Sequence, residues 1–277
     1  MPSHGQASEL LLTHRSAVET VAGNLLEAMS SYAAATPAGD VVSMDDLRLV
    51  SSGVDYPVFN AVLLAKPFQG SSEEWRELLW EAAAHYKARR LGWSLWLSEE
   101  MLPRASLPLA RASAARVGLR LIAEHQGMVA PEIRPTERGL KEKLEFRPVS
   151  DAPARADFCS VILRVFSVPS DIARRIYGSA EFWAGQYKAW VAYIGSQPVA
   201  TMATCTTAEA VGVYSVGTLA RYRGRGIGEA ITRHGLQHAS NAAGISRSIL
   251  QSTPAGIPLY RRMGYQGAGR FQVYISS

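Results

Sequence analysis

Apolar and polar residues alternate along the first 145 positions in patterns typical of both helices and strands. Residues 8–35 place apolar side chains at helical spacing, which predicts a helix. The run Val54–Ala65 predicts a mostly buried strand. The capping-box sequence at 71–74 predicts the start of a helix that continues to Arg90 and is ended by Gly92. After this helix the pattern predicts a strand at 93–97, a helix at 107–117 and a strand at 119–124. This order of strands and helices is that of an α/β fold.

The pattern in the second half begins with a strand and a helical region and then changes to consecutive strands. Leu144–Val149 predicts the first strand, and residues from about 156 to 177 predict a helical region that is divided at Pro169. The sequence Gly195-Ser196-Gln197-Pro198 predicts a tight turn between two paired strands. The remaining elements are strands at 188–194, 199–206, 211–219, 248–251 and 271–275, a helix from the glycine-rich segment to about 243, and a short helix at 257–262.

A polar segment at 135–146 divides the chain into two predicted domains, 1–140 and 141–277. A length of 277 residues suits two domains of about 150 residues each. Because 47% of the residues are hydrophobic and only 19% are charged, disorder is excluded as the dominant state.

The cysteines and the apolar runs indicate the compartment. Cys159 and Cys205 lie far apart and no CxxC occurs, which excludes a disulfide scaffold and a cysteine-based zinc module and favours a reducing compartment. The amino-terminal sequence has no basic start, and no apolar run approaches the roughly 20 residues that a membrane helix needs. We therefore expect a cytoplasmic protein that does not contact a membrane, either a monomer or a homodimer.

Charge is distributed unevenly between the two halves. The segment from Phe146 onward contains 14 Lys and Arg and 6 Asp and Glu, which gives it a net charge of +8. The first 145 residues carry a net charge of −3. Only the second half therefore has the field expected around a polyanion, either a nucleic acid or a phosphorylated cofactor.

A glycine-rich, basic segment at 221–228 joins a predicted strand to a predicted helix. Its glycines and arginines are Gly224, Gly226, Gly228, Arg221, Arg223 and Arg225. Backbone N–H groups and the positive end of the helix dipole converge at such a turn, and guanidinium groups suit phosphate oxygens. The segment lacks the Lys of a Walker loop, and Glu229 stands where a Rossmann fingerprint needs glycine. The segment is therefore predicted to bind an anion, but as neither of these motifs.

Residues from about 145 to 277 resemble the GNAT superfamily of acyl-CoA-dependent N-acyltransferases. Arg223–Gly228 matches the superfamily's [QR]-x-x-G-x-[GA] signature, and 259–265 looks like its LYxxxGF element. The resemblance implies an α/β (α+β) acyl-CoA N-acyltransferase fold, with a mixed, mostly antiparallel central sheet flanked by helices. The first 140 residues, including Asp55–Asn60, resemble a degenerate GNAT-like copy without the signature. The expected arrangement is a tandem of a degenerate domain and a catalytic acetyltransferase domain.

The resemblance also implies a place for acetyl-CoA. Backbone groups of Ser215, Val216, Gly217 and Thr218 would bind its pantetheine arm, and amides of Arg223, Gly224, Arg225, Gly226, Ile227 and Gly228 would bind its pyrophosphate. The Val216 amide would also meet the charge that develops on the thioester oxygen. Tyr260 would protonate the departing thiolate, since a phenol with a pKa of about 10 stays protonated at neutral pH.

The implied reaction is N-acetylation of a primary amine on a small molecule or peptide by direct attack, without a metal. Glu209 and, as an alternative, Glu181 are candidates for the base that deprotonates the amine. Trp183 and Tyr187 either line the acceptor site or pack in the core. The alternative function is a non-catalytic module that binds or senses acyl-CoA.

Other candidate chemistries are weaker. His234 and His238 share a helix face, but Gly235 replaces the Glu of an HExxH zinc motif, so packing is favoured over metal binding. Cys205 lacks a partner histidine, which disfavours thiol catalysis. Nucleic-acid binding is also disfavoured, because the basic half contains neither a Lys cluster nor an alternation of aromatic and basic residues.

Overall fold

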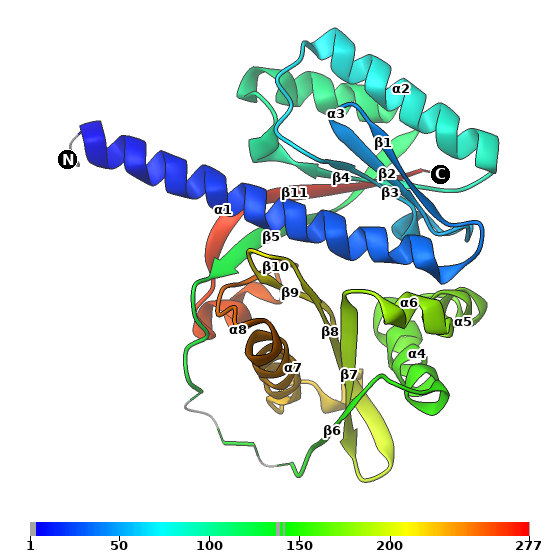
Figure 1. The fold of residues 1–277 in the computed structure, drawn as a ribbon, viewed down its shortest axis with the longest axis vertical. Coiled ribbons are helices and arrows are strands. Elements are labelled where there is room, and N and C mark those ends of the chain that lie inside the picture. Colours follow the sequence, from blue (N-terminus) through cyan, green and yellow to red (C-terminus); the bar gives the residue numbers. More distant parts are fainter. Residues whose placement is uncertain (1–3, 137–138, 141, 277) are drawn as a thin grey trace.

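The computed structural model describes residues 4–136, 139–140 and 142–276, with side chains from Arg15 onward (Figure 1). The strands are β1 (Asp40–Met44), β2 (Leu47–Ser51), β3 (Ala61–Leu64), β4 (Ser94–Ser98), β5 (Leu119–Ala130), β6 (Glu145–Pro148), β7 (Tyr187–Ile194), β8 (Gln197–Thr206), β9 (Val211–Thr218), β10 (Ser248–Ser252) and β11 (Gln266–Ser276). The helices are α1 (His4–Ser30), α2 (Ser72–Arg89), α3 (Leu107–Arg116), α4 (Ala152–Phe166), α5 (Ser170–Tyr177), α6 (Ala180–Ala184), α7 (Ile227–Ala243) and α8 (Ile257–Arg262).

All these strands form one sheet of eleven, in the order β1-β2-β3-β4-β11-β5-β10-β9-β8-β7-β6. The pairing is antiparallel except between β3 and β4 and between β9 and β10. Each parallel pair is joined through a helix, α2 or α7, because parallel neighbours need a crossover connection. The predicted fold class, a mixed and mostly antiparallel sheet flanked by helices, is confirmed.

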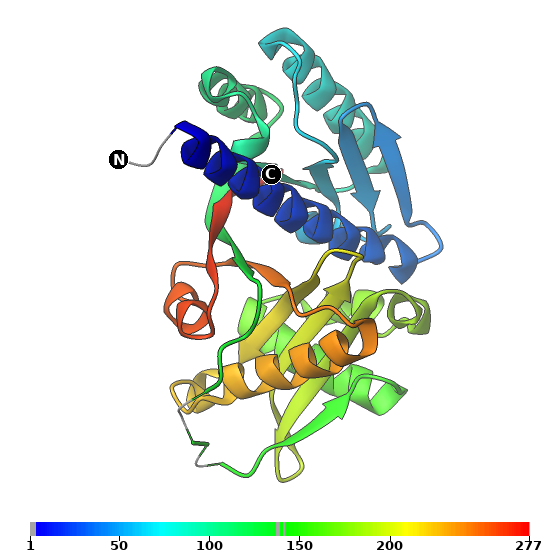
Figure 2. The ribbon, with the colours of Figure 1, turned by 60° about the vertical axis from the view of Figure 1, so that its left-hand side comes forward.

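The two halves of the chain exchange strands at the centre of this sheet. β5, from the amino-terminal half, lies between β10 and β11, and β11, from the carboxy-terminal half, lies between β4 and β5. Figures 1 and 2 show this pair running from one half of the molecule to the other. The sheet around β4 and the sheet around β10 are therefore each completed by a strand from the other half.

Helix α1 also joins the halves. It crosses the molecule next to the central strands (Figure 1), and its buried Asn24 binds the carboxy-terminal half. The Asn24 Nδ2 donates to the carbonyls of Cys205 and Ala210, each at 3.1 Å, and its Oδ1 accepts from the Tyr214 hydroxyl at 2.7 Å. The amide is thus satisfied inside the core, as a buried polar group must be.

Two apolar cores pack against the β7–β10 strands, one on each face. α7 covers the β7–β10 strands on one side and α4, α5 and α6 cover them on the other (Figure 1). The smaller core lies under α7 and includes Ile227, Ile231 and Met202. The larger core runs through both halves, from Tyr187 and Phe182 to the β2–β4 strands.

The amino-terminal half contains two strands that the sequence pattern missed. β1 and β2 were not expected, and the strand predicted over Val54–Ala65 is confined to Ala61–Leu64. The capping box is confirmed: the Ser71 hydroxyl accepts from the Glu74 amide, and the Glu74 carboxylate accepts from the Ser71 amide. The helix ends within one residue of the predicted Arg90, but Arg90 itself, and not Gly92, takes the left-handed conformation that ends α2.

In the carboxy-terminal half the order of elements is as predicted, with α6 added. Two central strands, one from each half, are longer than predicted: β5 continues past Glu124 to Ala130, and β11 starts at Gln266 instead of 271. These extensions are the residues that pair β5 with β10 and β11, so they depend on partners that are distant in sequence.

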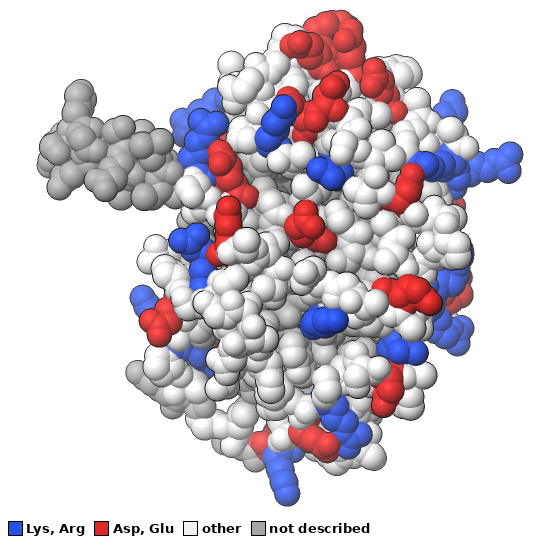
Figure 3. Space-filling view, viewed as in Figure 1, with Lys and Arg blue, Asp and Glu red and all other residues white. Residues whose placement is uncertain are grey.

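Within the described ranges no helix is both long and apolar enough to span a bilayer. Figure 3 shows basic and acidic side chains intermingled on the face viewed, with acidic groups gathered over α2 at the top.

The strand exchange predicts that the halves do not fold separately. A truncated chain of residues 144–277 lacks β5, which leaves the edges of β10 and β11 unpaired in its interior. We expect it to show no cooperative thermal transition by circular dichroism and to elute as an aggregate in size-exclusion chromatography. Co-expression with residues 1–143 should restore both properties. A cooperative transition of 144–277 alone would contradict the prediction.

Candidate functional site

Strands β9 and β10 separate after a short parallel stretch. They pair only from Val211–Val213 with Ser248–Leu250, so the rest of β9 has a free edge on this side. Opposite β8 the register shifts between Thr201 and Ala203, which places a bulge at Ser215, whose φ is +49°. The Thr201 hydroxyl donates to the Ser215 carbonyl at 3.0 Å and fixes the bulge. A bulge of this kind re-aims the backbone and side chains beside it.

A cavity of about 1060 Å³ occupies the gap between the two strands. Its walls include residues of both cores, Ile227 and Leu250 from the core under α7 and Tyr32 and Phe59 from the larger core. The cavity therefore passes from one side of the sheet to the other and is built by both halves of the chain. All four predicted residues of β9, Ser215 to Thr218, line it.

The glycine-rich turn forms one wall of this cavity. Gly224 and Gly226 have φ of +76° and +82°, a backbone region that residues with a Cβ rarely adopt. Gly226 is the N-cap of α7, and no described side chain caps the helix there. The first amides of α7, with the positive end of its dipole, are consequently left for a ligand. At Gly228 a Cβ would lie 3.3 Å from the Thr218 hydroxyl, which limits this position to a small residue.

Of the three predicted arginines, only Arg223 lines the cavity. Its Nε donates to the Thr218 carbonyl at 3.1 Å. Arg225 forms an ion pair with Glu142 at 2.9 Å. The guanidinium groups of Arg225 and Arg221 also lie over the Tyr222 ring, 5.3 Å and 4.9 Å from its centroid, respectively. The side chains of Arg221 and Arg225 thus support the turn instead of lining the site, which the sequence could not show.

Tyr260, on α8, lines the same cavity and is 8% exposed. Burial raises the pKa of its phenol well above the usual value, so the hydroxyl is protonated at neutral pH. Its ring packs against Tyr265 at a centroid distance of 5.6 Å. Tyr260 therefore has the protonation state that its predicted role requires.

The predicted bases lie elsewhere. The Glu209 carboxylate accepts from the Thr20 hydroxyl on α1 at 2.7 Å and does not line the cavity. The Glu181 carboxylate, also outside the cavity, accepts from the Ser179 hydroxyl, and hydrogen bonds lower its pKa. Glu209 thus ties its turn to α1 and Glu181 binds the residue that caps α6, and neither shares the cavity with Tyr260.

Trp183 and Tyr187 take different roles. Trp183 belongs to the core, and its Nε1 donates to the carbonyl of Tyr177 at 2.8 Å. Tyr187 lines the cavity, and its hydroxyl is 2.7 Å from the Ser215 hydroxyl at the bulge.

The sequence analysis missed a histidine. His125 of β5 lines the cavity, and its ring packs edge-on against Trp96 at 5.5 Å. Its Nδ1 is buried without a hydrogen-bond partner in the described part of the chain, and burial lowers its pKa from 6.5. The imidazole is therefore neutral at pH 7. No local motif marks His125; only the extension of β5 past Glu124 and its place beside β10 bring it to the cavity.

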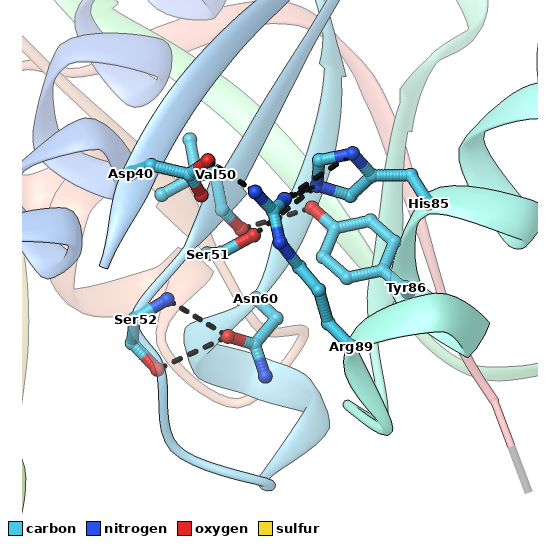
Figure 4. A network of polar contacts seen from close by, with 8 residues as sticks. All are labelled: Asp40, Val50, Ser51, Ser52, Asn60, His85, Tyr86 and Arg89. Carbon is cyan, nitrogen blue, oxygen red and sulfur yellow. Dashed lines mark hydrogen bonds and ion pairs between the residues drawn. The ribbon is translucent and has the colours of Figure 1, made fainter. Parts of the chain in front are cut away.

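A short 3₁₀ turn at Pro57–Phe59 forms the wall from the amino-terminal half, together with Tyr56. Asn60 anchors this turn (Figure 4). Its Oδ1 accepts from the Ser52 amide at 2.9 Å and hydroxyl at 3.0 Å, and its Nδ2 donates to the carbonyls of Val54 and Gly92, each at 2.8 Å. Figure 4 also shows Tyr86, whose hydroxyl donates to the Val50 carbonyl at 2.9 Å. The wall is thus fixed by bonds to buried groups.

Metal and thiol chemistry find no support among these residues. In the described chain no group of three or more His, Cys, Asp or Glu is placed to bind a metal ion. The rings of His234 and His238 lie 4.4 Å apart and pack against Phe146 and Trp190, respectively. Burial raises the pKa of the Cys205 thiol to about 12, so it is not a nucleophilic thiolate.

Comparison with known families agrees with this geometry. Residues 185–267, which include β9, the glycine-rich turn and Tyr260, match the family model described as an acetyltransferase (GNAT) domain. This part of the chain is a GNAT domain. No curated protein sequence matches the chain.

The structural relatives extend the GNAT-like fold over almost the whole chain. A GCN5-related N-acetyltransferase from Kribbella flavida is 17% identical, with a TM-score of 0.66 over 90% of this chain and 95% of its own. A functionally unknown conserved protein from Staphylococcus epidermidis is 15% identical, with a TM-score of 0.62 over 87% and 95%. A tandem GNAT protein from the clavulanic acid biosynthesis pathway is 14% identical, with a TM-score of 0.55 over 87% and 83%. At these identities the likeness concerns the fold alone.

The geometry of the turn predicts different effects at two glycines with the same backbone angle. Gly226 and Gly118 both have φ of +82°, but only Gly226 lines the cavity. Substitution of either by alanine should lower the free energy of unfolding by about 1 kcal/mol, measured by urea denaturation. Only Gly226→Ala should weaken coenzyme A binding, by about 10-fold or 1.4 kcal/mol in isothermal titration, because it deforms the amides at the start of α7. Equal affinities of the two variants would remove the turn from the binding site.

Proposed function

We propose that this protein is an acetyl-CoA-dependent N-acetyltransferase that acts on a primary amine of a small molecule or peptide. One observation carries the proposal: a single cavity is lined by the free edge of β9, the uncapped start of α7, the protonated Tyr260 and the neutral His125. Each of these groups suits a different part of the reaction.

The cavity fits the shape and charge of acetyl-CoA. The start of α7 offers free amides and the end of a helix dipole, which suit a pyrophosphate, and Arg223 adds a positive charge. The unpaired edge of β9 offers backbone groups to the amides of a pantetheine arm. The predicted binding residues Ser215 to Thr218, Arg223, Gly224 and Gly226 to Gly228 all line this path, whereas Arg225 contributes at most its backbone amide.

When bound, acetyl-CoA supplies a thioester: the amine nitrogen bonds to its carbonyl carbon, the C–S bond breaks, and an amide and a free thiol result. The Val216 amide, next to the bulge, is positioned to stabilise charge on the carbonyl oxygen. Tyr260 donates the proton that the leaving sulfur takes up.

His125 accepts the proton that the amine must lose. Among the described residues that line the cavity, the other ionisable groups are tyrosines, two arginines and Glu229, whose carboxylate is paired with Arg233 at 2.8 Å. Of these groups the imidazole is the neutral one that can take up a proton near pH 7, and its Nδ1 has no partner among the described residues, as a general base requires. His125 therefore replaces Glu209 in the proposed mechanism.

Two measurements test the function. Isothermal titration with acetyl-CoA should show saturable binding, and incubation with acetyl-CoA and an amine panel should release free thiol only when a suitable amine is present.

Tyr260→Phe should lower kcat about 100-fold with little change in acetyl-CoA affinity, because only proton donation is lost. Tyr265→Phe is the matched control: it loses a buried bond to Ser248 but does not line the cavity. Tight binding without amine-dependent thiol release by the wild type would favour an acyl-CoA sensor.

The role of His125 predicts a specific pH dependence. Because burial lowers its pKa, kcat/KM should show an acid limb that falls only as the pH drops through a value below 6.5. His125→Gln should lower kcat/KM about 100-fold and abolish this limb. His85 is the control, since its pKa is also lowered but it lies outside the cavity; His85→Gln should keep the wild-type profile. An unchanged acid limb in His125→Gln would exclude His125 as the base.

A further inference from the structure

One wall of the cavity, built mostly by the amino-terminal half, consists of apolar and aromatic side chains. They come from α1, the 3₁₀ turn, β4, β5 and β11, and include Tyr32, Tyr56, Phe59, Trp96, Ile122 and Val273. None of these elements belongs to the region that matches the GNAT model except the first residues of β11. This wall therefore determines which molecule reaches the reaction centre opposite the coenzyme.

Charged groups do not line this part of the cavity. Among the described lining residues the charged ones are Arg223, Glu229 and Arg262, and all three lie at the glycine-rich turn, α7 or α8. A substrate with a second ammonium group, a carboxylate or a phosphate would lose its hydration there without an opposite charge, at a large cost in free energy. The wall therefore disfavours polyamines, amino acids and phosphorylated amines.

Several tyrosine hydroxyls that line the cavity in and beside this wall already have partners. Tyr32 and Tyr177 bond to each other at 3.1 Å, Tyr187 bonds to Ser215, and Tyr214 bonds to Asn24 at 2.7 Å. These hydroxyls therefore offer little to a polyhydroxylated substrate such as an amino sugar. Two buried polar atoms of the wall have no partner among the described residues, the His125 Nδ1 and the Trp96 Nε1. The indole N–H can only donate, so the imidazole is the one of the two that can accept a proton from a nitrogen.

An apolar rim connects this wall with the surface. Ile122 and Phe166 line the cavity and are still 43% and 45% exposed. Ile122 sits in a bulge, because Ala123 pairs with Val273 and Leu121 pairs with the next residue, Tyr274. The bulge turns Ile122 into the cavity while Leu121, which is 47% exposed, stays outside it. Exposed apolar side chains at a cavity mouth are typical of a binding site for an apolar ligand.

We propose that the acceptor is a primary amine on an apolar, aromatic body, which enters past Ile122 and Phe166 and places its nitrogen at His125. The proposal rests on the acetyltransferase function and specifies its substrate class. The apolar body is buried among Trp96, Phe59 and Val273, and the amine passes its proton to the imidazole as it attacks the thioester carbon.

A panel of amines tests the proposal. We expect kcat/KM for 2-phenylethylamine and tryptamine to exceed that for spermidine, glucosamine and glycine by about 10- to 100-fold, the factor that burial of one aromatic side chain provides. Isothermal titration should also show that 2-phenylethylamine binds the coenzyme A-loaded protein and that spermidine does not.

Two neighbouring substitutions form a matched pair. Ile122→Asp places a carboxylate in the cavity wall and should lower kcat/KM for 2-phenylethylamine about 10-fold while raising it for 1,4-diaminobutane. Leu121→Asp places the same charge on an equally exposed position outside the cavity and should change neither value. The acetyl-CoA affinity of both variants should equal that of the wild type.

The outcomes separate this inference from the function on which it rests. If the wild type binds acetyl-CoA but prefers spermidine or glucosamine, acetylates none of the apolar amines, or responds equally to both aspartates, the substrate class is wrong and the acetyl-CoA site stands. If the wild type does not bind acetyl-CoA, the proposed function itself fails.

Discussion

The pairing of β5 with β11 is the interaction on which the rest of the structure depends. Each of these strands comes from one half of the chain and lies inside the part of the sheet that the other half builds. Because β5 is thereby set next to β10, a histidine from the amino-terminal half reaches the cavity that the GNAT domain opens between β9 and β10. The exchange of strands thus joins the two halves in one site, in which one half provides the glycine-rich turn and the other half provides much of the remaining wall.

The two halves contribute different physical chemistry. Near α7 the cavity is polar and positive, with free amides and Arg223, whereas the wall from α1, β4 and β5 is aromatic and uncharged. Such a division suits the joining of a strongly anionic coenzyme to a molecule of low polarity. The amino-terminal half lacks a glycine-rich turn of its own, yet its fixed Asn60 network gives it a rigid surface to present (Figure 4).

Local sequence signals predicted the elements whose causes are local. The Ser71 capping box, the glycine-rich turn and the left-handed Gly244 at the end of α7 are specified by residues within a few positions of one another. The full length of β5 and the place of His125 are set by pairing between distant segments, so periodicity did not show them. For the same reason the sequence did not show that Glu209, which is close to β9 along the chain, binds Thr20 of α1.

The position of β11 also affects how the protein folds during its synthesis. β4 and β5 are complete by Ala130, whereas the strand that lies between them begins only at Gln266. During synthesis their facing edges stay open while the whole GNAT region is translated, and such edges readily pair with other chains. Closing the sheet is consequently a late, long-range step, and the nascent protein must pass a period in which its centre is still missing a strand.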